Sequence, residues 1–292
     1  MLQPAVAFSI KARSDPRHFT NVARWLALAR SAYGSSSTRK LGWVVPTHPF
    51  VEPSKPCNIN SMKEAEFDRF ADEYESQHRR NIAVTGESPE FFAEYKISQL
   101  ATFVPDLLAA PARILDFGSG IGNSIPFFRK HFPNALLTCA DASSRSIELS
   151  RKRFPGQERF TLVKDNEIPL DTNSFDIAFS ACVFHHIAQE DHRHWLAEML
   201  RVTRPGGLLV IFEHNPFNPL TVRAVNTCPF DENAKLIPAR TLIRSINDAG
   251  WVRSELCYHL FFPRALAGLR PIEKHLSWLA LGAQYSARAR KP

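Results

Sequence analysis

The sequence predicts a mostly parallel β-sheet with helices on both of its faces, which is an α/β fold of the doubly wound type. Short apolar runs alternate with longer segments of helical periodicity from residue 113 onward, and this alternation is typical of successive strand–helix–strand units. An apolar run at 113–117 also passes directly into a loop with glycines at 118, 120 and 122. Such glycines let the backbone turn tightly and approach a ligand closely before a helix begins.

The composition supports a large globular core and a reducing, cytoplasmic compartment. Hydrophobic residues make up 44% of the 292 residues and charged residues 22%. The five cysteines are widely spaced and form no CxxC pair, which argues against a disulfide framework and against a zinc site. No uninterrupted apolar run reaches membrane-spanning length.

Residues 1–61 differ from the rest of the chain in charge and composition. They hold eight Lys or Arg and two acidic residues, so nearly all of the net charge of +7 belongs to them. The nearly neutral remainder does not indicate a nucleic-acid surface. We interpret 1–61 as a basic, Pro- and Ser-rich leader: a disordered arm, a targeting segment, or untranslated sequence before a start at Met62. The last is favoured because globular patterning begins at Met62.

Two aromatic helices are predicted between residues 62 and 110, as a cap on the domain that we expect to span 62–292. The first covers 62–74, and the second begins at Ser88-Pro89 and extends to Leu108, with Ser as its cap and Pro in its first turn. Their aromatic residues either pack in the core or line a lid over a ligand, the latter formed by Tyr74, Phe91 and Tyr95.

The remaining elements follow in alternation. Strands are predicted at 113–117, 135–140, 160–163, 175–180, 208–212, 252–262 and 283–290. Helices are predicted at 124–132, 144–153, 191–202, 238–249 and 264–279, with an irregular stretch at 217–236.

Unusual polar residues follow the predicted strands, at the edge where such sheets bind their ligands. They are Asp116, Asp141, Asp165 and Asn166, His185 and His186, and Glu213 to Asn215. Asp141 lies 23 positions beyond Gly118, a distance at which an acid can hold the ribose hydroxyls of NAD or of S-adenosylmethionine. The glycines do not fit the dinucleotide pattern GxGxxG, because position 123 is Asn.

Four segments in order resemble the class I S-adenosylmethionine-dependent methyltransferases. They are LDFGSGIGN at 115–123, Asp141, DNEIPLDTNSFDIAFS at 165–180 and RVTRPGGLLVIFEH at 201–214. The resemblance is nearest to the small-molecule branch that includes quinone-biosynthesis methyltransferases. It implies a Rossmann-like sheet of seven strands whose last strand is antiparallel and lies between the fifth and the sixth.

The resemblance also implies which residues contact S-adenosyl-L-methionine. Asp116, Gly118, Ser119, Gly120 and Gly122 would lie against its methionine part, Asp141 would hold the ribose and Ala142 would lie beside the adenine. Asp165 and Asn166 would bind the adenine amino group, and Ala181 and Cys182 would flank the cofactor.

Methyl transfer positions a donor and an acceptor, and a base helps when the acceptor carries a proton. The candidates are His185, His186, Glu213 and His214, with His214 favoured because it ends the fifth strand. The blocks 215–219 and 228–231 are expected to build the acceptor pocket. The aromatic N-terminal helices and the Phe-rich loops favour an apolar or amphipathic small molecule as acceptor. We expect transfer to oxygen or carbon rather than to nitrogen.

Three other functions are weighed against this one. A catalytically idle cofactor-binding partner remains possible on the sequence, although acids at 116 and 141 argue against it. An NAD-dependent oxidoreductase is disfavoured by the glycine spacing. A nucleic-acid amino-methyltransferase is suggested only by Asn215-Pro216-Phe217, which follows the fifth strand rather than the fourth.

Overall fold

The computed structural model describes residues 79–228 and 234–292. All of them belong to one of the two compact units into which the chain divides, Cys57–Pro292. The predicted leader 1–61, the predicted helix 62–74 with Tyr74, and residues 229–231 of the predicted acceptor pocket lie outside the described residues.

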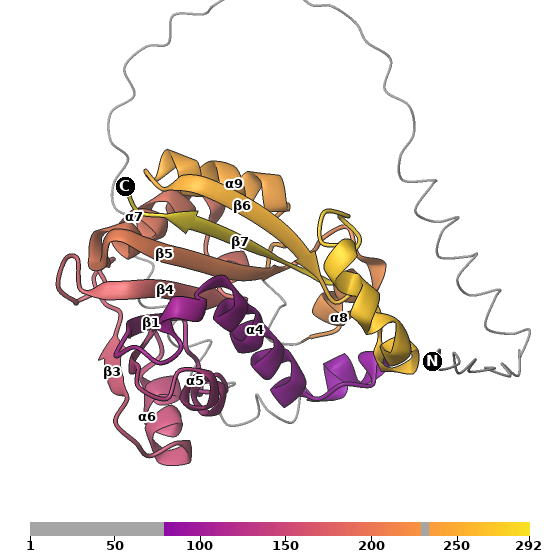
Figure 1. Cartoon of the computed structure of the whole chain (residues 1–292), viewed down its shortest axis with the longest axis horizontal. Helices are drawn as coiled ribbons and strands as arrows, with labels where there is room; N and C mark the ends of the chain where they lie inside the picture. The colour runs from indigo at the N-terminus through magenta and orange to yellow at the C-terminus, as the bar shows by residue number, and fades with distance from the viewer. Residues whose placement is uncertain (1–78, 229–233) are drawn as a thin grey trace, which may run out of the picture. The chain divides into compact units, whose positions relative to one another are not determined.

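The described residues form a seven-stranded sheet in the order β3-β2-β1-β4-β5-β7-β6 (Figure 1). The strands are β1 (Arg113–Phe117), β2 (Leu136–Asp141), β3 (Arg159–Leu162), β4 (Phe175–Ala181), β5 (Thr203–His214), β6 (Val252–His259) and β7 (Gln284–Arg290). Strands β1 to β5 pair in parallel, and β7 runs antiparallel between β5 and β6. This topology confirms the predicted Rossmann-like sheet and the place of its last strand.

The strand register brings the carboxyl ends of β1, β2, β4 and β5 together, and we call this the carboxyl edge of the sheet. Phe117 at the end of β1 pairs with Ala140 of β2 and with Ser180 of β4. Ala181 of β4 pairs in turn with Phe212 of β5. The glycine loop therefore lies next to Asp141 on one side and next to the residues that follow β4 on the other.

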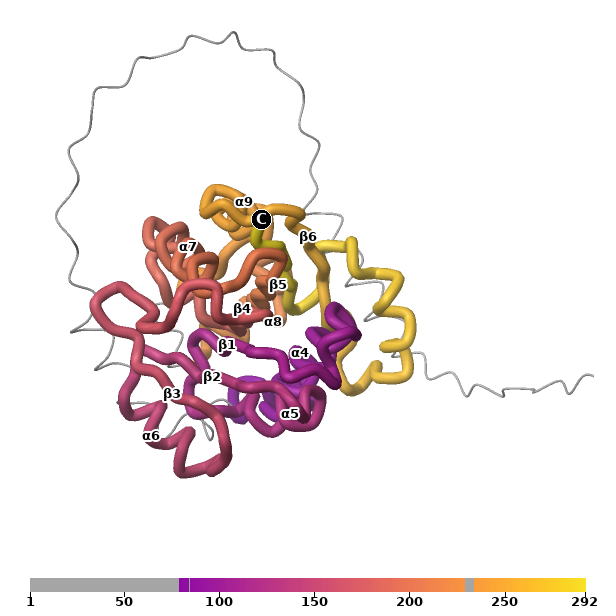
Figure 2. The backbone as a smooth tube through the Cα atoms, turned by 60° about the vertical axis from the view of Figure 1, so that its left-hand side comes forward, coloured from indigo at the N-terminus to yellow at the C-terminus, as the bar shows by residue number. Residues whose placement is uncertain are grey.

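Helices cover both faces of the sheet (Figure 2). They are α4 (Pro89–Phe103), α5 (Ile125–His131), α6 (Ser144–Arg153), α7 (His192–Val202), α8 (Pro219–Asn226) and α9 (Ala239–Asp248). On one face, α4 and α5 bury apolar side chains against Ile114 and its neighbours, whereas α7 and α9 pack on the other face against Leu115 and its neighbours. The alternation of side chains along a strand produces these two separate cores.

Polar side chains begin the helices where the sequence supplies them. Ser88 accepts a hydrogen bond from the backbone N–H of Phe91, and Ser143 accepts one from Ser146. Asn218 accepts two, from the N–H groups of Leu220 and Thr221, at the start of α8. Each bond satisfies a backbone donor that has no partner inside the helix.

Several predicted boundaries were wrong for local reasons. Helix α4 ends at Phe103 rather than Leu108, because Pro105 begins a separate 3-10 turn. Strand β5 begins at Thr203 rather than Leu208. The Pro-Gly-Gly sequence at 205–207 lies at an irregularity in the pairing of β4 with β5, so it interrupts the pairing but not the strand itself.

Two further segments differ in type from the prediction. The stretch 217–236 contains helix α8, which Asn218 caps and Pro219 begins. The predicted helix 264–279 is a 3-10 segment, Arg264–His275, with Pro271 inside it. His185 and His186 lie in a 3-10 turn, Phe184–His186, shortly after the end of β4. In the part of the chain that the structure describes, no helix combines the length and apolarity that crossing a membrane requires.

Candidate functional site

The glycine loop after β1 is held against the end of β2. The N–H groups of Gly118 and Ser119 donate to the carbonyl of Ala140, at 2.8 and 3.1 Å. Gly118 has φ of +75°, and a Cβ there would lie 2.3 Å from Cγ2 of Val183. Gly120 has φ of +53° with open space where its Cβ would be. A side chain at 118 would collide with the protein, whereas one at 120 would enter the space over the loop.

Asp116 lies beneath this loop as a buried carboxyl group without a full set of partners. It is 2% exposed, and its Oδ2 has no hydrogen-bond partner in the described structure. Burial and, less strongly, the negative charge of Asp141 raise its pKa to about 7, against the opposing effect of the positive charge of Lys96. A buried acid of this kind is complementary to a cationic ligand group.

The carboxylate of Asp141 links the glycine loop to the start of α6. Its Oδ2 accepts a hydrogen bond from the N–H of Gly120 at 2.7 Å, and its Oδ1 accepts one from Ser143 at 2.8 Å. Asp141 is half-buried, and the next residue, Ala142, is exposed. This pair therefore borders solvent at the carboxyl edge.

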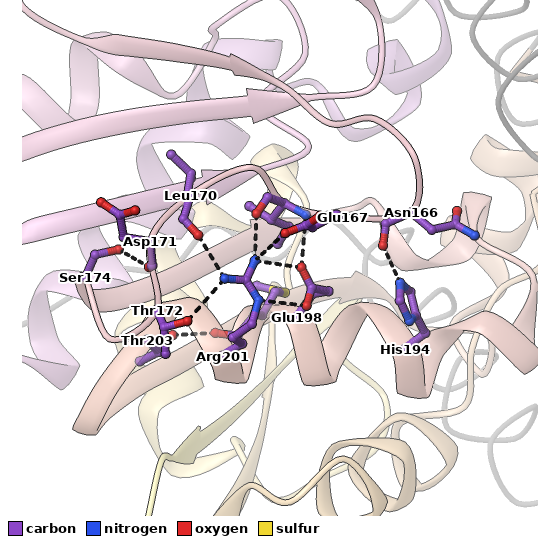
Figure 3. Close-up of polar contacts among 12 residues, drawn as sticks. Asn166, Glu167, Leu170, Asp171, Thr172, Ser174, His194, Glu198, Arg201 and Thr203 are labelled. Carbon is purple, nitrogen blue, oxygen red and sulfur yellow. Dashed lines mark hydrogen bonds and ion pairs between the residues drawn. The ribbon is translucent and has the colours of Figure 1, made fainter.

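The turn after β3 carries Asp165 and Asn166, both with positive φ. Figure 3 shows how side chains of α7 hold this turn. The ring Nε2 of His194 donates to the carbonyl of Asn166 at 2.6 Å. The guanidinium of Arg201 donates to the carbonyls of Ile168 and Leu170, at 2.7 and 2.9 Å. These contacts fix the backbone of the turn and leave the side chain of Asp165 exposed.

The first of the two histidines after β4, His185, forms a buried ion pair with Glu213 of β5. Nδ1 of His185 lies 2.6 Å from Oε2 of Glu213, and both side chains are almost completely buried. The other oxygen of Glu213 accepts hydrogen bonds from the N–H groups of Val183 and Phe184. Burial raises the pKa of Glu213, but the charge and hydrogen bond of His185 outweigh it and leave the pKa below its usual value. This carboxylate is therefore fully engaged as a structural partner.

His186 and His214 both lie close to the ring of His185. The centroid of the His185 ring is 4.2 Å from that of His186 and 5.3 Å from that of His214. Unlike His185, both are half-buried. The structure thus brings all three predicted histidines together, with His185 the innermost.

The sequence did not predict a catalytic role for two further residues of this region, Lys96 and Cys182. Lys96 on α4 is close enough to influence the pKa of both Asp116 and Cys182, and it forms no ion pair within the described ranges. Cys182 follows Ala181 with φ of +59°; burial raises the pKa of its thiol, but the positive charges of His214 and Lys96 outweigh burial and lower the pKa to about 7. The sequence offers no signal for Lys96, since a lysine on an amphipathic helix is ordinarily a solvated one.

The predicted acceptor block begins with two buried asparagines that anchor it. The side-chain amide of Asn215 donates to the carbonyl of Gly282 at 2.7 Å, and that of Asn218 donates to Leu281 at 2.8 Å. An open groove of about 550 Å³ lies along this block and the following helix, lined by the apolar Pro216, Phe217, Pro219 and Val222 and by the polar Arg223, Asn226 and Thr227. Among the described residues, no three His, Cys, Asp or Glu side chains are arranged to hold a metal ion.

Comparisons with known proteins agree with this geometry. The family of methyltransferase domains matches residues 115–211, which run from the middle of β1 into β5. A ubiquinone/menaquinone biosynthesis C-methyltransferase of Desulfotalea psychrophila is 30% identical over 105 residues, 36% of this chain and 42% of the relative. A trans-aconitate 2-methyltransferase of Methylobacterium nodulans is 29% identical over 177 residues, 56% of this chain and 66% of the relative.

Solved structures share the fold. A methyltransferase of Thermotoga maritima, described as a possible histamine N-methyltransferase, has a TM-score of 0.54 and 22% identity, covering 78% of this chain and 99% of its own. A second, from Archaeoglobus fulgidus, has a TM-score of 0.52 and 15% identity, over 68% and 94% of the two chains.

The fold is the Rossmann-like fold of solved methyltransferase structures, and residues 115–211 match the family of methyltransferase domains. The fold, the domain match and the relatives together support a class I S-adenosylmethionine-dependent methyltransferase. The matched segments span less than two thirds of the curated relatives' own lengths, between 42% and 66% in the two cases above.

Proposed function

We propose that this protein transfers the methyl group of S-adenosyl-L-methionine to a small-molecule acceptor. The observation that supports this most strongly is the buried, incompletely partnered carboxyl of Asp116 beneath a loop whose Gly120 faces open space. The cofactor carries both an ammonium group and a sulfonium, and it supplies the electrophilic methyl group itself. An acid at this position can offset a positive charge that would otherwise be costly to bury.

The binding residues that we propose follow the carboxyl edge in order. Asp116 and the loop Gly118, Ser119, Gly120 and Gly122 hold the methionine part, and Asp141 exchanges its bond to Gly120 for the ribose hydroxyls. Ala142 and Ala181 flank the cofactor, and Asp165 with Asn166 binds the adenine amino group. The clamp of α7 on the latter turn supports this role, because a fixed turn loses little entropy on binding.

We propose His214 as the base that removes a proton from the acceptor. It is half-buried at the end of β5, and imidazole exchanges protons near neutral pH. His186, whose ring centroid lies 4.2 Å from that of His185, is the alternative base. His185 itself is a positioning residue, since its Nδ1 is engaged by Glu213. We assign proton transfer to the half-buried His214 or His186 and positioning to the buried His185 on the basis of their exposure.

The acceptor that we propose is apolar or amphipathic and is methylated on oxygen or carbon. The groove lined by Phe217 and its apolar neighbours begins two residues after His214, which supports an acceptor with an apolar part. The names of the relatives, a quinone-biosynthesis C-methyltransferase and a trans-aconitate methyltransferase, are consistent with a small-molecule acceptor, and the first name is consistent with transfer to carbon.

The proposal is tested by calorimetric titration of the full chain with S-adenosylmethionine, beside its Asp141→Ala variant. A charge-assisted pair of hydrogen bonds contributes about 1.5–3 kcal/mol, so the variant should bind about tenfold to a hundredfold more weakly. Asp248→Ala removes an exposed acid of α9 and should bind as the parent does. Absence of binding by the parent protein would contradict the proposal, and binding without transfer to any acceptor in a labelled-methyl screen would favour an idle partner.

A further inference from the structure

The register of β5, β7 and β6 brings three polar side chains into one row at the carboxyl edge of the sheet. Gln284, the first residue of β7, pairs with His214 of β5 and with His259 of β6. Directly opposed residues of antiparallel strands lie on the same face of a sheet, with Cβ atoms about 4.5–5.5 Å apart. The side chain of Gln284 therefore lies between that of His214, the proposed base, and that of His259.

Contacts of His259 identify this face of the sheet as the one that α4 covers. The hydroxyl of Tyr95 on α4 lies 3.3 Å from Nδ1 of His259. Nε2 of His259 lies 2.8 Å from the hydroxyl of Ser286 on β7, and its ring centroid is 5.5 Å from that of Phe212. Because side chains alternate along a strand, Gln284 lies on the same face as Ser286.

The polar atoms of His259 are engaged within the protein, whereas an atom of Gln284 is not. Both ring nitrogens of His259 have a hydroxyl partner. Burial and, less strongly, the positive charge of Arg288 lower the pKa of His259 to about 4, so its ring is neutral at pH 7. Gln284 is 5% exposed, and its Oε1 has no hydrogen-bond partner in the described structure. A buried carbonyl oxygen of this kind costs free energy until a donor reaches it.

We propose that Oε1 of Gln284 is a binding site for a hydroxyl group of the acceptor molecule, next to the group from which His214 takes a proton. This inference rests on the proposed function, because it uses His214 as the base. The second hydroxyl keeps its proton and donates it to Oε1, which thereby gains the partner that it lacks in the free protein.

The positions of the two side chains indicate the class of ligand. Gln284 and His214 are directly opposed across the β5–β7 pair, an arrangement that matches two polar groups on neighbouring atoms of one molecule. The groove lined by Phe217 and other apolar residues begins two residues after His214. A ligand that meets both conditions carries two neighbouring hydroxyl groups on an apolar framework.

Two aromatic compounds that differ by one hydroxyl group test this site. The first, 2,3-dihydroxynaphthalene, has two neighbouring hydroxyls on an apolar ring system, and 2-naphthol lacks one of them. Calorimetry measures the affinity of the full chain for each compound at pH 7, with and without saturating S-adenosylhomocysteine. We expect the diol to bind about three- to tenfold more tightly than 2-naphthol, which is the contribution of one neutral hydrogen bond. This comparison does not depend on the folding of any variant.

Gln284→Met retains the length of the side chain and removes Oε1. The variant should bind both compounds with nearly equal affinity, because it has lost the group that distinguishes them. Since Oε1 has no partner in the free protein, the variant should unfold at the same urea concentration as the parent. Gln157→Met, which replaces an exposed amide just before β3, is the matched control and should retain the preference for the diol.

Equal affinities of the parent for the two compounds, or binding of neither, would overturn the inference. A preference that Gln284→Met retains, or a large loss of stability in that variant, would also overturn it. A protein that binds S-adenosylmethionine and methylates 2-naphthol as readily as the diol would retain the proposed function and exclude this site. A preference that Gln284→Met abolishes, in a protein that binds no S-adenosylmethionine, would retain the site and contradict the proposed function.

Discussion

The buried carboxylate of Glu213 lies 2.6 Å from Nδ1 of His185 and also accepts the N–H groups of Val183 and Phe184. One side chain at the end of β5 therefore fixes the 3-10 turn that follows β4. The turn is held from its other side by His192, whose Nε2 donates to the carbonyl of Phe184 at 2.9 Å. The positions of His185 and His186 thus depend on a residue from the neighbouring strand.

Replacing Glu213 by Gln should destabilise the protein strongly. The substitution keeps the size of the side chain but removes a buried charge from its partners, a change that typically costs about 3–5 kcal/mol. Urea unfolding at pH 7 measures the free energy of unfolding. Glu255→Gln is the matched control, because Glu255 is 60% exposed and pairs with Arg288 at the surface, and it should change stability by less than about 1 kcal/mol.

The effect of Glu213→Gln should also depend on pH. Because the pKa of Glu213 is lowered in the folded protein, its stabilising contribution is present above the ordinary value of 4.5 and is lost as pH falls through the folded value. The difference between parent and variant should therefore shrink below pH 4.5. An equal difference at pH 3.5 and pH 7 would show that the charge is not the source of the stabilisation.

The sheet could be predicted from the sequence because each strand is a short apolar run followed by a turn signal. Strand β1 was predicted with its observed bounds, since Arg113 begins the run and Gly118 ends it. Helix α8 was missed because the Asn218-Pro219 pair is equally typical of a loop and of a helix start. What decides in favour of the helix is the anchoring of Asn218 to Leu281, a contact across 63 residues that local patterns do not contain.

The candidate site also has a part that could be predicted from local sequence patterns and a part that could not. The residues after each strand could be predicted because parallel strands end at a common edge. The partners of these residues could not, because they depend on side chains from other elements. The positive charge of Lys96 on α4 influences the pKa of Asp116, and Arg201 of α7 holds the turn after β3 through the carbonyl of Ile168. Only the packing of those helices on the sheet makes either contact possible.

Binding of S-adenosylmethionine should strengthen as pH rises through about 7. The pKa of Asp116 is raised to about 7 by burial and by Asp141, so its carboxyl is largely protonated at pH 5.5, and a cationic ligand favours the ionised form. Between pH 5.5 and 8, titration of this one group permits an affinity gain of up to about 30-fold. Calorimetry across this range checks it, and Asp116→Asn should bind weakly with little dependence on pH. A parent affinity that falls with rising pH would contradict the role of Asp116.

Removing the guanidinium of Arg201 should loosen the turn at 165–170. Arg201→Ala loses the hydrogen bonds to the carbonyls of Ile168 and Leu170 and removes the ion pair with Glu198, which keeps only its hydrogen bond from the N–H of Ile168. We expect a loss of about 1–3 kcal/mol in unfolding free energy and a weaker affinity for S-adenosylmethionine. Urea unfolding and calorimetry measure the two effects. Arg244→Ala, which removes an exposed arginine of α9, should leave both unchanged, and an unaltered affinity in Arg201→Ala would exclude the turn from the binding site.

Alanine substitutions at Gly118 and Gly120 of the glycine loop, with Gly206 of β5 as a control, should distinguish effects on stability from effects on cofactor affinity. Gly118→Ala combines a positive φ with a Cβ 2.3 Å from Val183, so it should cost about 2–5 kcal/mol of stability. Gly120→Ala has a positive φ but open space around the new methyl group, and the backbone strain alone costs about 1–2 kcal/mol. Gly206 of β5, which lies away from the loop, also has a positive φ and open space for a methyl group, so Gly206→Ala is the matched control. If the space over Gly120 receives the cofactor, Gly120→Ala and Gly206→Ala should lose similar stability in urea, while only Gly120→Ala loses affinity in calorimetry. Equal affinities for these two variants would mean that the cofactor does not approach Gly120, and the binding site would then lie elsewhere along the carboxyl edge.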